Sequence, residues 1–174
     1  MSTSQTLIEG RCWVFGDNID TDVIIPAQYV GIRDFAKMAA HAMEAAEPTF
    51  GTQCRPGDIV VGGTSFGVGS SREAAAVVFK CLGVRVIIAE SYGRIFFRNA
   101  INNGLYAVEA PGVRSIVESG GRLQVDLTHG RIVNPATGAE VQVVPWSPMI
   151  LALVREGGLV PFLKSGRRNR IAQT

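Results

Sequence analysis

FGVGSSREAAAVVF, residues 66–79, is the stretch of sequence that decides the fold class. Its glycines precede a Ser-Ser-Arg-Glu cluster, and an apolar, alanine-rich run follows that cluster. The run predicts a helix over about 71–81. The apolar segments 59–62 and 84–90 flank this helix, and such segments are typical of buried parallel strands. The order therefore predicts a strand, a glycine turn, a helix and a second parallel strand.

The Ser-Ser-Arg-Glu cluster has two interpretations. Ser70 and Glu73 have the spacing of a capping box, in which the serine hydroxyl accepts from a first-turn amide and the glutamate reaches back. That interpretation leaves Ser71 and Arg72 without a role, and a cation in the first turn opposes the helix dipole. The alternative is that Arg72, the hydroxyls and the free amides hold an anionic ligand. Ligands of such units gather at this carboxyl end of the strand.

The rest of the chain predicts a mixed sheet. A first strand is expected at 7–15, and the aspartates of 16–26 are expected to fix turns through side-chain to backbone bonds. The alternating pattern of 122–145 predicts an antiparallel meander. The other expected elements are a helix over 33–47, a short helix closed by Asn103 and Gly104, a strand at 105–109, a helix over 146–156 and a turn at 159–164. The predicted fold class is α/β, with a βαβ core and a meander.

The composition indicates one globular domain: the chain has 174 residues, of which 47% are hydrophobic. We expect this domain over residues 1–164, followed by a basic tail over 165–174. A net charge of +2 is too small to favour a nucleic-acid partner. No apolar run approaches roughly 18 residues, and the start lacks the basic-then-apolar order of a signal peptide. We therefore expect a cytoplasmic protein without a membrane partner.

The cysteines argue against a metal or cluster site wholly inside this chain. Cys12, Cys54 and Cys81 are odd in number and widely spaced, and neither histidine lies near a cysteine in the sequence. Cys81, at the end of the predicted helix, is expected in the core. Both histidines are expected at the surface.

Three motifs in order resemble the small subunit of 3-isopropylmalate dehydratase, which is the swivel domain of the aconitase superfamily. They are GDNIDTDVIIP at 16–26, GGTSFGVGSSRE at 62–73 and VIIAESYGRIFFRNAINNGL at 86–105. The resemblance extends over about 10–164. It implies a swivelling β/β/α domain that closes over a large subunit, which carries a [4Fe-4S] cluster on three cysteines. The implied reaction is a hydro-lyase reaction that removes and re-adds water on a hydroxy-diacid.

The resemblance also assigns roles to residues. Ser70 matches the family's catalytic serine, an alkoxide base, and Ser71 and Arg72 match positions that hold a substrate carboxylate. Serine is a poor base in water and needs a local positive field, which Arg72, the first-turn amides and the partner's iron can supply. Arg33 matches a carboxylate-binding arginine only with a shift of one residue in a variable loop. The alternative for Arg33 is an exposed arginine at a helix start.

A specificity loop is expected at 28–33. It matches the family segment that faces the substituent in which the substrates differ. Tyr29, Val30 and Ile32 are apolar or aromatic, so they favour an alkyl group, as in isopropylmalate or dimethylmalate, over a third carboxylate.

Three departures from the family motif leave alternatives open. Ser65 replaces an asparagine, Val68 a cysteine and Ala74 a histidine. Ala74 admits a related dehydratase acting on dimethylmalate, homoaconitate or a methylated citrate. A second alternative is a non-catalytic swivel domain that binds a diacid or a partner. The joint presence of serines 70 and 71 with Arg72 favours the enzyme, and the lysine of a phosphate-binding P-loop is missing.

Overall fold

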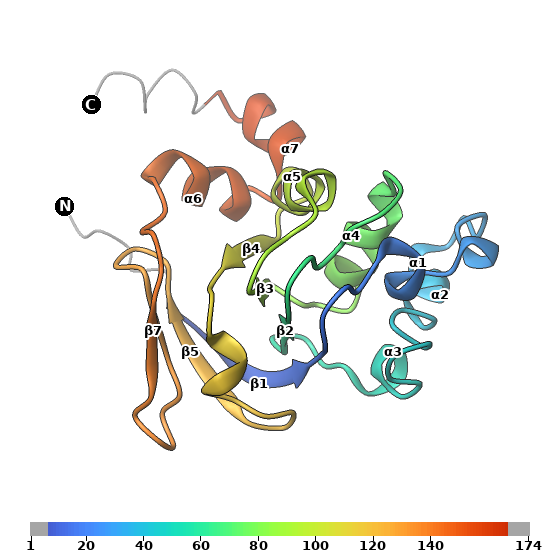
Figure 1. Ribbon diagram of the computed structural model, residues 1–174. Helices are drawn as coiled ribbons and strands as arrows, with labels where there is room; N and C mark the ends of the chain where they lie inside the picture. The colour runs from blue at the N-terminus through green and yellow to red at the C-terminus, as the bar shows by residue number, and fades with distance from the viewer. Residues whose placement is uncertain (1–6, 167–174) are drawn as a thin grey trace.

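The computed structural model describes residues 7–166 and shows a curled, seven-stranded mixed sheet with helices packed on it (Figure 1). The strand order is β4-β3-β2-β1-β5-β6-β7. The strands are β1 (Leu7–Val14), β2 (Ile59–Gly62), β3 (Val86–Ala89), β4 (Tyr106–Glu109), β5 (Arg122–Asp126), β6 (Arg131–Val133) and β7 (Glu140–Gln142). β1 joins the two halves, because it pairs parallel with β2 and antiparallel with β5.

The parallel half contains the predicted βαβ unit. The helices are α1 (Thr21–Ile24), α2 (Phe35–Ala39), α3 (Phe50–Gln53), α4 (Glu73–Cys81), α5 (Arg94–Asn102), α6 (Pro148–Arg155) and α7 (Leu159–Lys164), with 3-10 turns η1 (Ala27–Tyr29) and η2 (Val113–Ser115). α4 connects β2 to β3 and α5 connects β3 to β4, and both strand pairs are parallel. The predicted antiparallel meander is β5, β6 and β7.

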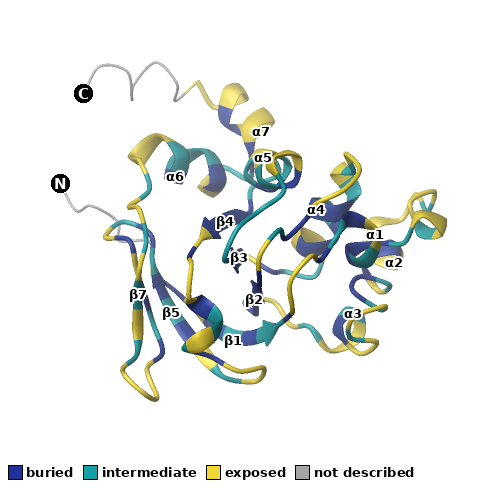
Figure 2. Cartoon of the chain, in the orientation of Figure 1, coloured by how far each residue is buried: buried dark blue, intermediate teal, exposed yellow. Residues whose placement is uncertain are grey.

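The central strands are apolar throughout because both faces of the sheet are covered. Val60 and Ile87 point into one core with α4 and α5, whereas Val61 and Ile88 point into a second core with the meander and α6. All four residues of β2 and of β3 are buried, and Figure 2 shows these strands in dark blue. The unbroken apolar segments that predicted parallel strands therefore follow from burial on two sides.

The helix predicted over 33–47 is wrong in length. α2 ends at Ala39, and turns occupy 40–46. Met43 has a left-handed φ of +59°. Its amide donates to the carbonyl of Ile24 at 2.9 Å and therefore does not form a hydrogen bond within a helix. A contact with α1 thus overrides the helix propensity of the alanines.

Two further expectations about single residues need correction. Cys81 is exposed, because the inward face of α4 is formed by Ala75, Ala76, Val78 and Phe79. His41 is half-buried, not a free surface residue, and its ring stacks on Tyr29 with centroids 3.8 Å apart.

The predicted division into a domain over 1–164 and a basic tail stays a prediction. Ser165 and Gly166 follow α7, and the rest of the tail, with its arginines, lies outside the described residues. Within residues 7–166, none of the helices has the length and apolar character needed to span a membrane.

Candidate active site

The loop 63–72 leaves β2 at its carboxyl end and crosses to the start of α4. Two isolated parallel bridges hold it in place, Asp20 with Val68 and Phe66 with Tyr92. The amide of Thr21 also donates to the carbonyl of Val68 at 2.9 Å. The loop is therefore fixed on both sides by segments that are distant in sequence.

The ring of Phe66 anchors the start of this loop. Phe66 is fully buried, and its centroid lies 5.6 Å from Phe96 and 6.1 Å from Tyr92. The next residue, Gly67, has a φ of +73°, and a Cβ built there would lie 2.2 Å from the Phe96 ring. Glycine is required at 67 both for the backbone conformation and for this close approach.

Ser70 is exposed, and its side chain meets Thr21. The two hydroxyl oxygens lie 3.2 Å apart, and Thr21 Oγ1 donates to the carbonyl of Ser70 at 3.1 Å. The capping-box interpretation is wrong, because α4 begins only at Glu73 and Arg72 is its N-cap residue, with no side-chain cap bond. The Glu73 carboxylate instead accepts from Asn103 Nδ2 at 3.4 Å.

Arg72 is held by α1 through a single nitrogen. Its Nη1 donates to Asp22 Oδ1 at 2.5 Å and to the carbonyl of Ile25 at 3.2 Å. The arginine side chain is 19% exposed, and Nε and Nη2 make no hydrogen bond with any residue in the described range 7–166. The guanidinium is thus fixed at one corner and can donate to an anion from the other side.

The aspartates of 16–26 have different functions. Asp17 accepts from the amide of Thr64 at 2.8 Å, and this bond holds the pKa of the Asp17 carboxyl below its usual value. Asp20 caps α1 by accepting from the amide of Val23. The bond of Asp20 confirms the predicted local role in fixing turns. The bond of Asp17 is different, because it joins two segments that lie 47 residues apart in the sequence. For Asp22 the prediction is wrong, because this carboxylate pairs with Arg72.

Ser71 and Arg33 are both exposed. Among the residues that the structure describes, neither side chain has a hydrogen-bond or ion-pair partner. Arg33 immediately precedes Asp34, which caps α2 by accepting from two amides. The position of Arg33 therefore matches the exposed helix-start alternative as well as a side chain awaiting a ligand.

The expected specificity loop at 28–33 begins three residues after Ile25, whose carbonyl accepts from Arg72. Tyr29 lies in η1 and stacks on His41, and Ile32 packs against the first core. Val30 is 39% exposed. Of the three side chains proposed to select the substrate, Val30 is exposed, whereas Tyr29 and Ile32 are half-buried.

Two of the departures from the family motif concern shape. Ser65 has a left-handed φ of +56°, a conformation in which asparagine is enriched, and its amide donates to Ser91 Oγ at 2.9 Å. Ala74 is half-buried and packs against the first core. Val68, by contrast, is 40% exposed on the loop that carries Ser70.

The described residues offer no ligand set for a metal. No group of three or more His, Cys, Asp or Glu side chains comes together within 7–166. Burial raises the pKa of Cys12 and of Cys54 to about 12, so both thiols are protonated and are poor ligands.

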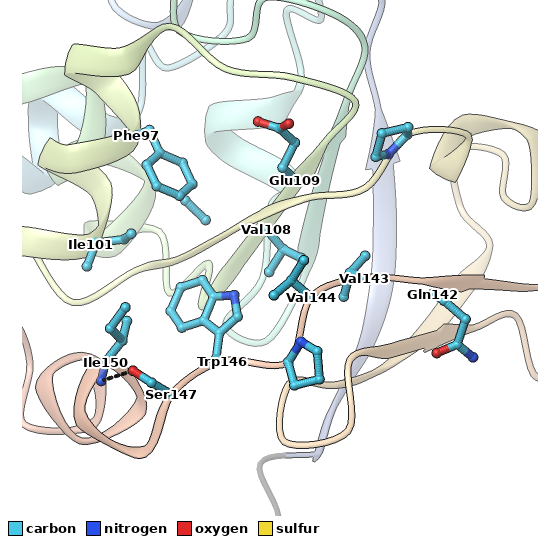
Figure 3. A pocket seen from close by; sticks show the side chains of 13 residues that line it. Phe97, Ile101, Val108, Glu109, Gln142, Val143, Val144, Trp146, Ser147 and Ile150 are labelled. Atoms are coloured by element: carbon cyan, nitrogen blue, oxygen red, sulfur yellow. Dashed lines mark hydrogen bonds between the residues drawn. The ribbon is translucent and has the colours of Figure 1, made fainter.

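An apolar cavity lies away from the loop 63–72. It has a volume of about 870 Å³ and lies between α5, β4, the segment 142–147 and α6. Figure 3 shows its mainly apolar lining, which includes Phe97, Ile101, Trp146 and Ile150. Neither Ser70 nor Arg72 contributes to it. Both residues lie apart from this cavity, Ser70 on the exposed loop and Arg72 half-buried beside α1.

Comparisons with known proteins extend over nearly the whole chain. The 3-isopropylmalate dehydratase small subunit of Pyrobaculum calidifontis is 49% identical, over 91% of this chain and 98% of the relative. The corresponding small subunit of Aquifex aeolicus is 47% identical, over 92% and 96%. The chain belongs to the family of 3-isopropylmalate dehydratase small subunits. Residues 38–112 match the aconitase C-terminal domain family, so the resemblance seen in the sequence motifs is confirmed.

The fold comparison agrees with this family. A crystal structure of the 3-isopropylmalate dehydratase of Methanocaldococcus jannaschii has a TM-score of 0.86 at 34% identity, and the match covers 97% of this chain and all of that one. The predicted α/β class is confirmed, with the mixed sheet shared by this small-subunit family. Family membership also supports a hydro-lyase activity.

One relative has a different name. The methanogen homoaconitase small subunit of Methanothermobacter thermautotrophicus is 46% identical, over 90% of both chains. Its identity to this chain lies within the range of the dehydratase relatives. Overall similarity therefore identifies the small-subunit family, and the substrate has to be argued from the site.

Sequence reasoning missed Thr21 and the pairing of Asp22. Both lie in the quoted motif 16–26, and their contacts with Ser70 and Arg72 span 49 and 50 residues. The only signal available was that the two motifs occur together in the family.

Proposed function

We propose that this chain is the small subunit of a heterodimeric 3-isopropylmalate dehydratase, which isomerises its hydroxy-diacid by dehydration and rehydration in the cytoplasm. The observation that carries the proposal is the placement of Ser70 and Arg72 on one exposed loop. Thr21 contacts the first residue and Asp22 holds the second. A base and a carboxylate-binding group are thereby presented together at the carboxyl end of β2.

In this proposal Ser70 Oγ, in its ionised form, takes the proton from the carbon next to a substrate carboxylate. The electron pair of the broken C–H bond forms the C=C bond, and the hydroxyl group leaves the neighbouring carbon with its own bonding pair. Rehydration reverses these changes with the hydroxyl added to the other carbon, and Ser70 returns the proton. Ser71 and the free donors of Arg72 bind the carboxylate that the two forms share.

The large subunit is the proposed source of a [4Fe-4S] cluster. When bound, this cluster supplies a Lewis-acidic iron for the leaving hydroxyl group. The contribution of the present chain is the positive field at Ser70. The charge of Arg72 and the first-turn amides of α4, a helix of nine residues, both favour an anion at that point.

A reconstitution experiment tests the function. We expect the isolated chain, purified under anaerobic conditions, to be folded, colourless and inactive. Mixing it with a cluster-bearing 3-isopropylmalate dehydratase large subunit should give dehydratase activity on 3-isopropylmalate. Circular dichroism, iron content and the ultraviolet absorbance of the unsaturated diacid are the measurements. A brown isolated chain with stoichiometric iron, or a folded complex that turns over no hydroxy-diacid, would contradict the proposal and favour a non-catalytic swivel domain.

The substrate class is argued from the loop at 28–33. Val30 presents an exposed apolar surface, so a third carboxylate placed there would lose hydration without gaining a partner. An alkyl group is favoured, as in isopropylmalate or dimethylmalate. The second candidate, a homoaconitate or methylated citrate substrate, is favoured by the homoaconitase relative and by the exposed Arg33, which has no ion-pair partner among residues 7–166.

Replacing Val30 with arginine is expected to shift the ratio of kcat/KM toward a tricarboxylate. Loss of apolar contact with one or two methyl groups is worth about 1–3 kcal/mol, and the new charge adds a partner for the third carboxylate. The measurement is kcat/KM for 3-isopropylmalate and for homoaconitate on the reconstituted enzyme, before and after the change. Val160→Arg, which adds the same charge on exposed α7, is the matched control. An unmoved ratio would mean that this loop does not select the substrate.

A further inference from the structure

The hydroxyl of Thr21 has one proton and two possible acceptors on Ser70. It lies 3.1 Å from the Ser70 carbonyl and 3.2 Å from Ser70 Oγ. A carbonyl oxygen can only accept, so the contact with the Ser70 carbonyl is a hydrogen bond when the Thr21 proton points to that carbonyl. In the contact between the two hydroxyls, Ser70 is then the donor. This arrangement suits a neutral Ser70.

An ionised Ser70 requires the opposite arrangement. An alkoxide can only accept, so the Thr21 hydroxyl has to rotate and donate to Ser70 Oγ. No proton is transferred in this rotation, and the carbonyl of the exposed Ser70 can bond to water instead. Hydrogen bonds to ionised groups are stronger than those between neutral groups, so the rotation favours the ionised form.

Thr21 itself is rigidly placed. It is 2% exposed and is the first residue of α1. Its amide donates to the carbonyl of Val68, and a Cβ built on Gly69 would lie 3.4 Å from Thr21 Oγ1. The threonine therefore contacts the loop before Ser70 as well as Ser70 itself.

The charged groups around this pair have partners of their own. Asp20 caps α1, Asp22 pairs with Arg72, and Glu73 accepts from Asn103. Within residues 7–166, the Thr21 hydroxyl is the one side-chain group in hydrogen-bond contact with Ser70 Oγ.

We propose that Thr21 is a positioning residue for Ser70, whose hydroxyl rotates from the Ser70 carbonyl to Ser70 Oγ and stabilises the ionised form that removes the substrate proton. This inference rests on the proposed function, because it requires Ser70 to act as the base. It adds a residue of α1 to the chemistry of the loop before α4.

The test compares Thr21→Val, which keeps the shape and removes the hydroxyl, with Thr21→Ser, which keeps the hydroxyl and removes the methyl group. Without the Thr21 donor, Ser70 stays protonated up to a higher pH. In Thr21→Val the rising limb of the kcat–pH profile should therefore move to higher pH. At neutral pH, kcat should fall by about 10- to 100-fold with little change in KM. Thr21→Ser should restore both properties. Thr52→Val, at an exposed hydroxyl that donates to the carbonyl of Thr49, is the control.

A second measurement separates stabilisation of the ionised Ser70 from any effect of Thr21→Val that does not depend on Ser70. In a Ser70→Ala background, Thr21→Ser and Thr21→Val should have equal kcat, because no alkoxide remains to be stabilised. The inference is overturned if Thr21→Val keeps the wild-type pH profile, or if the two variants still differ in that background. An inactive wild-type complex, or a fully active Ser70→Ala, would instead overturn the proposed function.

Discussion

Replacing Ser70 with alanine is expected to lower kcat of the reconstituted enzyme by about 10²- to 10⁴-fold, the typical contribution of a positioned base. KM should change little, because the groups assigned to the carboxylate, Ser71 and Arg72, remain. The substitution removes one hydrogen bond, between Ser70 Oγ and Thr21, at an exposed position. Such a bond contributes about 0.5–1.5 kcal/mol, so the domain should remain folded.

The measurements are kcat, KM and Tm for the Ser70→Ala complex. Ser115→Ala is the matched control, because the Ser115 hydroxyl is exposed and donates only within its own turn, to the carbonyl of Gly112. A folded Ser70→Ala complex with near-normal kcat would show that Ser70 is not the base. Since Ser70 does not cap α4 either, a large loss of Tm is not expected from the loss of a cap.

Replacing Arg72 with lysine is expected to raise KM by about 10- to 100-fold and to lower kcat less. A charge-assisted hydrogen bond contributes about 1.5–3 kcal/mol, and lysine cannot reproduce the paired donors of a guanidinium. Lysine keeps a positive charge, so Asp22 need not be left without a cationic partner. The expected loss is therefore in substrate binding, and folding should be largely preserved.

The measurement is the dissociation constant of the substrate in a Ser70→Ala background, where binding is separated from turnover. Arg131→Lys is the matched control, because this exposed arginine pairs with Glu140 in the meander, between β6 and β7. Equal affinity with and without the Arg72→Lys substitution would show that Nε and Nη2 of Arg72 do not bind the carboxylate. Its role would then be confined to the contacts with Asp22 and Ile25.

The sequence alone predicted the parts of the fold that depend on local pattern. The apolar segments at 59–62 and 84–90 predicted β2 and β3 because strands buried on both faces show no alternation. The alternation of 122–145 predicted β5, β6 and β7 because a strand with one face in the core places every second side chain inside. The glycine turn then placed Ser70 and Arg72 at the carboxyl end of β2.

Only the tertiary structure decided which side chains those residues meet. Thr21 contacts Ser70 across 49 residues and Asp22 contacts Arg72 across 50, and both contacts require the segment 19–21 to lie along the loop before α4. The same cause ended the helix predicted over 33–47, where the amide of Met43 bonds to Ile24. Local propensity describes a few neighbouring residues, whereas these bonds depend on how distant segments pack, so no pattern within one segment could have predicted them.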